Sequence, residues 1–157
     1  MKKLASGFLA LVILLSIGAS VATEKPLSSM KFKDCEISIL GARMSKKGQQ
    51  YVAKEAGGDR PVIVIDFEWS HSDKQDTKMF MTAFTIKAFQ NGVELDTAIM
   101  IDEVDSSEHL RSIKDGVVRQ VAEGYVLEDM SSPVEIEITK FFDLFSKDKL
   151  TYTFTFK

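Results

Sequence analysis

The fold of this chain is decided by the stretch Val62-Ile63-Val64-Ile65-Asp66-Phe67-Glu68-Trp69. Its odd-numbered positions are all large and apolar, whereas Asp66 and Glu68 occupy even-numbered positions. Successive side chains of a β-strand point to opposite faces of the sheet, so this alternation predicts a strand with one face in a core and the other in water. Trp69 belongs to the apolar row, and we expect it to pack between two sheets.

Two later segments repeat the period of two. Apolar residues alternate with glutamates over residues 134–138, and large apolar residues alternate with threonines over 150–156. Asn91-Gly92 separates two further apolar segments, and this dipeptide favours the two-residue turn of a β-hairpin. About seven strands are predicted in all, and that number in one short chain indicates an all-β sandwich. The predicted strands are 32–40, 62–69, 79–90, 93–101, 117–127, 134–138 and 150–156.

Residues 1–22 have the order of a secretion signal. Lys2 and Lys3 precede an apolar run over residues 4–17, and small residues at positions 20 and 22 form a cleavage signal. The run is shorter than the ~20 residues that a membrane span needs. We therefore predict a signal peptide at 1–22, a flexible segment at 23–30 and a single domain at 31–157. The mature protein is expected outside the cytoplasm, secreted or extracytoplasmic, with no membrane span.

The charge of the chain bears on its partners. It carries 20 Lys and Arg against 23 Asp and Glu, for a formal charge of -3. The signal peptide contains two of the lysines and no acid, so the mature part has 18 against 23, or -5. The field of an anionic protein repels nucleic acids and anionic wall polymers. We therefore expect no nucleic-acid partner.

Cys35 is the one cysteine, so no internal disulfide can form. A lipid-bearing cysteine would directly follow the apolar part of the signal, but Cys35 follows Lys33-Asp34 well inside the mature chain. It shares a predicted strand face with Ile37 and Ile39. We expect a buried, unreactive thiol and a protein without a lipid anchor.

Several motifs together resemble the DUF5067 family of small exported bacterial proteins. They are Phe67-Glu68-Trp69-Ser70, Phe89-Gln90-Asn91-Gly92-Val93-Glu94-Leu95, Ile113-Lys114-Asp115-Gly116 and Ser132-Pro133-Val134-Glu135-Ile136. The resemblance implies an immunoglobulin-like sandwich and export, and it implies no catalytic residue. The chain departs from the family where proline often precedes the glycine turn, because Asp115 stands there. It also lacks the lipid-anchored cysteine of many relatives.

No catalytic site is predicted from the sequence. His71 is followed by Ser72-Asp73, but neighbours along a chain do not make a catalytic triad, and there is no Gly-x-Ser-x-Gly motif. Asp66 and Glu68 on an open sheet face would both stay ionised, which does not suit acid–base catalysis. We expect no enzyme and no cofactor. A secreted hydrolase or metal-dependent enzyme that uses Asp66, Glu68, His71 or the acidic loop 102–108 is the alternative.

Residues 102–108 form the densest acidic stretch. Its carboxylates, Asp102, Glu103, Asp105 and Glu108, are oxygen ligands of the kind that calcium prefers. The stretch lacks the EF-hand spacing and its central glycine. We therefore expect a solvated loop and no bound metal, with these four residues as the weak metal candidates.

Four large apolar residues lie within residues 141–145, among them Phe141, Phe142 and Phe145. We expect them to form a plug that closes one end of the sandwich, and an exposed patch that binds a partner is the alternative. Other candidate contacts are His71 and Asp73, in the loop 70–78. We expect this loop and the loops 102–114 and 128–133 to lie at one end of the fold and to contact the partner.

We therefore predict an exported, monomeric, non-catalytic binding protein that acts at or near the bacterial cell envelope. Its partner would be a protein or another envelope component. An inhibitor of an extracellular hydrolase is a further alternative, because a rigid loop of such a sandwich could enter an active site.

Overall fold

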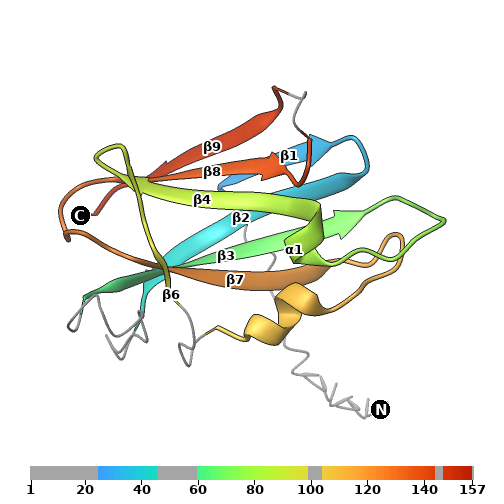
Figure 1. Ribbon diagram of the computed structural model, residues 1–157, viewed down its shortest axis with the longest axis horizontal. Coiled ribbons are helices and arrows are strands. Elements are labelled where there is room, and N and C mark those ends of the chain that lie inside the picture. Colours follow the sequence, from blue (N-terminus) through green and yellow to red (C-terminus); the bar gives the residue numbers. More distant parts are fainter. Residues whose placement is uncertain (1–24, 46–59, 99–103, 144–146, 157) are drawn as a thin grey trace, which may run out of the picture.

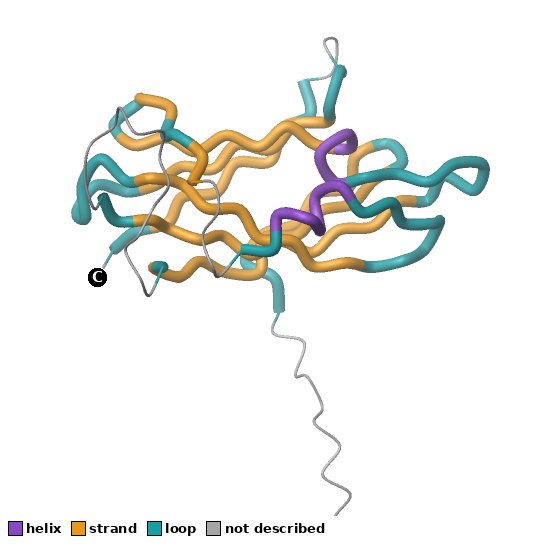
Figure 2. The backbone as a smooth tube through the Cα atoms, turned by 60° about the horizontal axis from the view of Figure 1, so that its bottom comes forward, coloured by secondary structure: helices purple, strands orange, loops and turns teal. Residues whose placement is uncertain are grey.

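A computed structural model describes residues 25–45, 60–98, 104–143 and 147–156, so the predicted signal peptide lies outside the described residues. These residues form two antiparallel β-sheets that pack face to face (Figures 1 and 2). The predicted all-β, immunoglobulin-like sandwich is confirmed in class and layers, although the described residues contain nine strands.

The first sheet has the strand order β1-β2-β3-β7-β6, and the second has the order β5-β4-β8-β9. The strands of the first sheet are β1 (Ser28–Phe32), β2 (Cys35–Met44), β3 (Val62–His71), β7 (Arg119–Val126) and β6 (Thr97–Ala98). Those of the second are β5 (Val93–Glu94), β4 (Phe84–Gln90), β8 (Val134–Lys140) and β9 (Lys149–Phe154). The described residues also form two short helices, α1 (Phe80–Ala83) and the 3-10 helix η2 (Ser106–Leu110).

The first strand begins earlier than the sequence indicated. β1 pairs with β2 from Ser28↔Ile39 to Phe32↔Cys35, and the amide of Leu27 donates to the carbonyl of Ile39 (2.8 Å). The prediction of a flexible segment at 23–30 is therefore wrong over its last three residues. Ser28 and Ser29 are both small and polar, so no apolar alternation marks the start of this strand.

Two predicted strands are each divided in two. The predicted strand 79–90 begins with the helical turn α1, and only then continues as β4. The predicted strand 93–101 is β5 in one sheet followed by β6 in the other, because the chain crosses between the sheets at Leu95 and Asp96. The hairpin turn predicted between them is confirmed, with φ of 51° at Asn91 and 78° at Gly92.

The core lies between the sheets and contains the predicted apolar row of β3. Trp69 is 2% exposed, as expected, and its ring centroid lies 5.9 Å from those of Phe80 and Phe84. The opposite face of β3 was expected to be wet, but Val62 and Val64 are fully buried there. They pack with β6 and the end of β7 in a second, smaller cluster, so only the Asp66–Glu68 half of that face is polar.

None of the helices in the described ranges is long and apolar enough to cross a membrane.

Candidate functional site

The loops predicted to recognise a partner do not all gather at one end. The segment after β3 pairs with residues near Ile113: the Lys78 amide donates to the Ile113 carbonyl (3.1 Å), and the reverse bond is 2.9 Å. Residues 128–133 instead follow the end of β7 that pairs with Val62, at the start of β3. The prediction of a single cluster is therefore wrong for residues 128–133, which lie at the opposite end.

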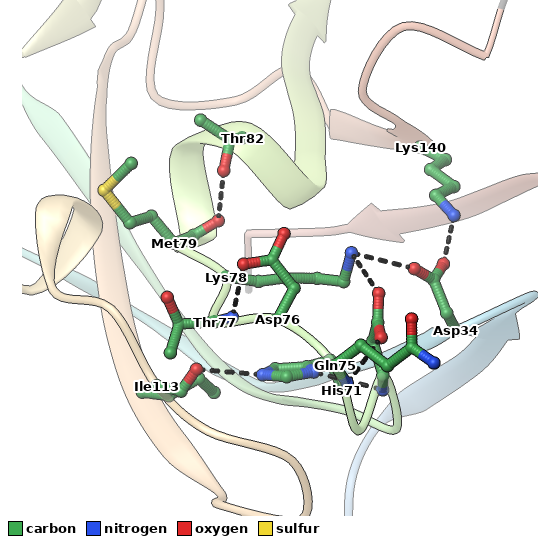
Figure 3. A network of polar contacts seen from close by, with 11 residues as sticks. Asp34, His71, Gln75, Asp76, Thr77, Lys78, Met79, Thr82, Ile113 and Lys140 are labelled. Atoms are coloured by element: carbon green, nitrogen blue, oxygen red, sulfur yellow. Dashed lines mark hydrogen bonds and ion pairs between the residues drawn. The ribbon is translucent and has the colours of Figure 1, made fainter.

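His71, which was predicted to contact a partner, is only 3% exposed and is therefore buried inside the fold. The Asp73 amide donates to its Nδ1 (3.3 Å), and its Nε2 lies 2.9 Å from the Ile113 carbonyl oxygen (Figure 3). A carbonyl can only accept, so Nε2 carries the hydrogen and both ring nitrogens are used. His71 is thus a buried link between two loops.

Asp34, in the turn between β1 and β2, is the centre of the ion pairs at this end (Figure 3). Lys78 approaches it within 3.1 Å, and Lys140 at the end of β8 forms a second ion pair with it. Burial alone would raise the pKa of the Asp34 carboxyl, but hydrogen bonds and charge from Lys140 and Lys78 lower it to about 2. The network joins the β1–β2 turn, the loop after β3 and the end of β8.

Asp73 belongs to the edge of this network. Its carboxylate lies 3.3 Å from the Lys78 ammonium and accepts a hydrogen bond from the Gln75 amide (3.1 Å). These contacts, the Gln75 bond first, lower the pKa of Asp73. The Asp73 carboxylate therefore stabilises the loop to which it belongs.

Phe141 and Phe142 follow β8 directly, and we call them the aromatic pair. Phe142 is 83% exposed and Phe141 is 36% exposed, so for these two residues the expectation of a plug is wrong. Their rings lie edge to face with centroids 4.3 Å apart. Phe142 has a φ of 57°, a left-handed conformation that is costly for a bulky side chain. The third candidate, Phe145, lies outside the described residues.

The aromatic pair is anchored at its base. The Phe141 amide donates to the carbonyl of Ala83 at the end of α1 (3.0 Å), and Lys140 is held by Asp34. The exposed rings therefore stand on a fixed backbone, with the Phe142 ring almost fully accessible.

The described carboxylates of the acidic stretch have partners within the protein. Asp105 precedes η2 and accepts a hydrogen bond from the Ser107 amide (3.0 Å). Glu108 pairs with Arg119 and with Arg111 (3.3 Å). Asp102 and Glu103 lie outside the described residues. Within the described ranges, no group of three or more His, Cys, Asp or Glu side chains could hold a metal ion.

His71 and the Asp66–Glu68 pair lie on opposite faces of β3, so the three residues that the enzyme alternative required do not converge. Asp66 forms an ion pair with Arg43, and Glu68 accepts a hydrogen bond from Gln120 (3.4 Å). These contacts link neighbouring strands on the outer face of the first sheet.

Cys35 is 2% exposed in β2, as predicted. Burial, followed by the negative charge of Asp34, raises the pKa of its thiol to about 11. The thiolate, which is the reactive form, is therefore scarce at neutral pH.

One polar cluster was missed in the sequence. Glu123 of β7 faces His109 of η2, with Nε2 of the histidine 3.5 Å from Oε1 of the glutamate, and it accepts a hydrogen bond from the Tyr125 hydroxyl. Burial raises the pKa of Glu123, while Tyr125 and His109 oppose that rise. The sequence did contain one sign of this cluster. Glu123 interrupts an apolar row with a period of two, because it stands between the buried Val121 and Tyr125 on the same face of the strand.

Comparison with solved structures agrees with the fold. A putative lipoprotein of Bacillus subtilis is 10% identical with a TM-score of 0.57, over 81% of this chain and 38% of its own. A second one, of Staphylococcus aureus, is 13% identical with a TM-score of 0.50, over 76% of this chain and 83% of its own. This chain thus spans well under half of the Bacillus protein, and at such identities the likeness concerns the fold alone.

No curated protein matches the chain. Residues 19–140, which run to the end of β8, match the domain of unknown function DUF5067. The resemblance noted in the sequence is therefore confirmed, and the chain belongs to the DUF5067 family.

Proposed function

We propose that this protein is an exported, non-catalytic binding protein that contacts a protein of the bacterial cell envelope through Phe141 and Phe142. The observation that carries the proposal is the exposure of the aromatic pair, with Phe142 at 83%. Large aromatic side chains are frequent anchors of protein interfaces, where they fill pockets on the partner. A water-exposed, left-handed phenylalanine lowers stability, and such costs concentrate at functional positions.

Location outside the cytoplasm is supported by the signal-like order of residues 1–22 and by the lipoprotein names of the structural neighbours. Cys35 is buried in β2 and would not carry a lipid. Attachment to the envelope would then be non-covalent, through the partner.

A protein fits the chemistry of the aromatic pair better than an anionic polymer or an anionic lipid surface does. The mature chain has a formal charge of -5, from 18 basic against 23 acidic residues, which disfavours both anionic surfaces at long range. An apolar pocket on a protein would instead take up the rings by the hydrophobic effect.

The test is co-sedimentation of the purified protein with envelopes of the producing organism, across a salt series. We expect binding that survives moderate salt, because screening weakens charge contacts much more than apolar ones. The double variant Phe141→Ser/Phe142→Ser should bind at least about tenfold more weakly, as expected for the loss of two interface anchors. Treating the envelopes with protease beforehand should abolish the binding.

The matched control is Val93→Ser/Met130→Ser. Val93 and Met130 are 59% and 52% exposed and lie at the other end of the sandwich, so the control removes similar apolar surface away from the pair. It should bind like the parent protein. The proposal is overturned if the parent stays in the supernatant, if both double variants bind alike, or if protease-treated envelopes bind as before.

A further inference from the structure

The row of β7 that faces the core contains a carboxylate. Val121 and Tyr125 are 4% and 2% exposed, and Glu123 stands between them at the side of the first sheet, where β6 pairs only with the last part of β7. The helices α1 and η2 lie against this side (Figure 2). An ionisable side chain thus occupies a position of β7 where an apolar side chain is expected.

The two oxygens of Glu123 have different surroundings. Oε2 accepts the hydrogen bond from Tyr125, whereas Oε1 faces Nε2 of His109 at 3.5 Å. Nδ1 of His109 lies 3.2 Å from the Ser106 carbonyl oxygen, which can only accept, so Nδ1 carries a hydrogen. Nε2 is buried and has no hydrogen-bond partner among the described residues. Oε1 of Glu123 is the carboxylate oxygen that does not accept the Tyr125 hydrogen bond.

His109 is fixed in this position by its neighbours. The ring of Phe80 packs against it with a centroid distance of 5.5 Å. Arg119 lies nearby, but its guanidinium is paired with Glu108. Within the described part of the chain, His109 is thus the one basic side chain that reaches Glu123.

A cavity of about 310 Å³ opens beside Glu123 and His109. Its walls are mainly apolar, from Met81, Val104 and Leu110, and both His109 and Glu123 line it. The Glu123 side chain remains 20% exposed, so a molecule in the cavity could touch it. Such a cavity, apolar with a few convergent polar groups, is typical of small-molecule sites.

We propose that this cavity binds an organic amine, with a primary ammonium group against the Glu123 carboxylate and a short apolar body against Met81, Val104 and Leu110. An ammonium can donate a hydrogen bond to the carboxylate oxygen that the Tyr125 hydroxyl leaves free. Its positive charge offsets the carboxylate in a poorly hydrated place, where unpaired charge is costly. A carboxylate ligand would be repelled, and a divalent metal would find only two protein ligands.

The test is titration of the purified protein, expressed as the full chain, with phenethylamine, followed by the NMR methyl signals of Met81 and Leu110. 2-Phenylethanol and phenylacetate, with the same apolar body, serve as neutral and anionic probes. We expect the amine to bind about tenfold or more tighter than the alcohol, the range of a charge-assisted hydrogen bond. Phenylacetate should not bind.

Glu123→Gln should remove the preference for the amine, while the control Glu135→Gln, on β8, should keep it. In the unmodified protein, amine affinity should fall in acid, because protonation of Glu123 removes its negative charge while phenethylamine stays charged. This measurement needs no variant to fold. The aromatic pair is not involved, so Phe141→Ser/Phe142→Ser should bind amine normally.

Equal shifts with the alcohol, an affinity independent of pH, or shifts caused by zinc ions and not by the amine would each overturn the proposal.

Discussion

The segments on either side of β8 are built in opposite ways. The segment before it, residues 127–133, is held from inside by Gln90, which is 1% exposed. The Gln90 amide nitrogen donates to the carbonyls of Asp129 (3.1 Å) and Ser132 (2.8 Å), and its oxygen accepts from the Glu128 amide (2.8 Å). The segment after it exposes the aromatic pair, with Phe142 in a left-handed conformation.

Asp129 adds to the order of the first segment. It accepts hydrogen bonds from the amides of Ser131 (2.7 Å) and Ser132 (2.6 Å), and bonds from these two serines lower its pKa. A segment with this many internal partners has few groups left for another molecule. The proposed partner surface is therefore the segment with fewer internal bonds and a strained backbone, and not the segment that Gln90 holds.

The largest effect should come from Gln90→Leu. The substitution leaves the carbonyls of Asp129 and Ser132 and the amide of Glu128 without their partner. We expect a loss of about 3 kcal/mol in the free energy of unfolding, since each buried unpaired group costs about 1–3 kcal/mol. Urea unfolding measures it. Gln120→Leu, on an exposed position of β7, should change stability by less than about 0.5 kcal/mol; equal losses would show that Gln90 does not hold the segment.

An intermediate effect is expected for Asp34→Asn, which loosens the base of the aromatic pair. The pKa of about 2 in the folded protein lies below the ordinary value of 3.8 for an aspartate, so the ionised carboxyl stabilises the fold above about pH 4. This contribution, about 2 kcal/mol, is lost as the pH falls from 4 towards 2. Unfolding curves of the parent and the variant should therefore converge in acid.

The exposed Asp115 offers the control for that measurement, because it takes no part in the ion pairs with Lys78 and Lys140. Asp115→Asn should keep the parent's dependence on acid. A gap between the parent and Asp34→Asn that stays constant down to pH 2 would contradict the assigned role of Asp34.

The smallest effect, and one of opposite sign, is expected for Phe142→Asn. A left-handed conformation costs an ordinary residue about 1–2 kcal/mol, and asparagine tolerates it. The lost contact with Phe141 is worth about 0.5–1.5 kcal/mol, so we expect a net gain of about 0.5 kcal/mol by thermal or urea unfolding. Phe142→Leu keeps the backbone strain and should show no gain. A clear loss with Phe142→Asn would mean that the pair supports the fold, and the contrast between the two segments would fail.

The period of two was sufficient to predict the sandwich, since it is a local consequence of one dry and one wet face. It failed where distant parts cover a face, as at Val62 and Val64 under β6. It also failed at Leu95, where the chain changes sheet within a few residues. Neither the covering of a strand face by a distant segment nor a change of sheet can be recognised from the neighbouring residues in the sequence.

The candidate site was predictable only in part. Phe141 and Phe142 were recognised as apolar, but their exposure depends on the packing around α1 and β8. The contact between Glu123 and His109 joins β7 to η2, and the sequence showed only that a carboxylate interrupts an apolar row. Convergence of separate segments is a property of the tertiary structure.

The buried thiol of Cys35 has a practical consequence. With a pKa of about 11, it will react slowly with alkylating reagents at neutral pH. A cysteine introduced at an exposed position would then be labelled almost alone, with no need to remove the native one. A fluorophore or spin label could thus be placed beside either segment to report on its motion and on the arrival of a partner.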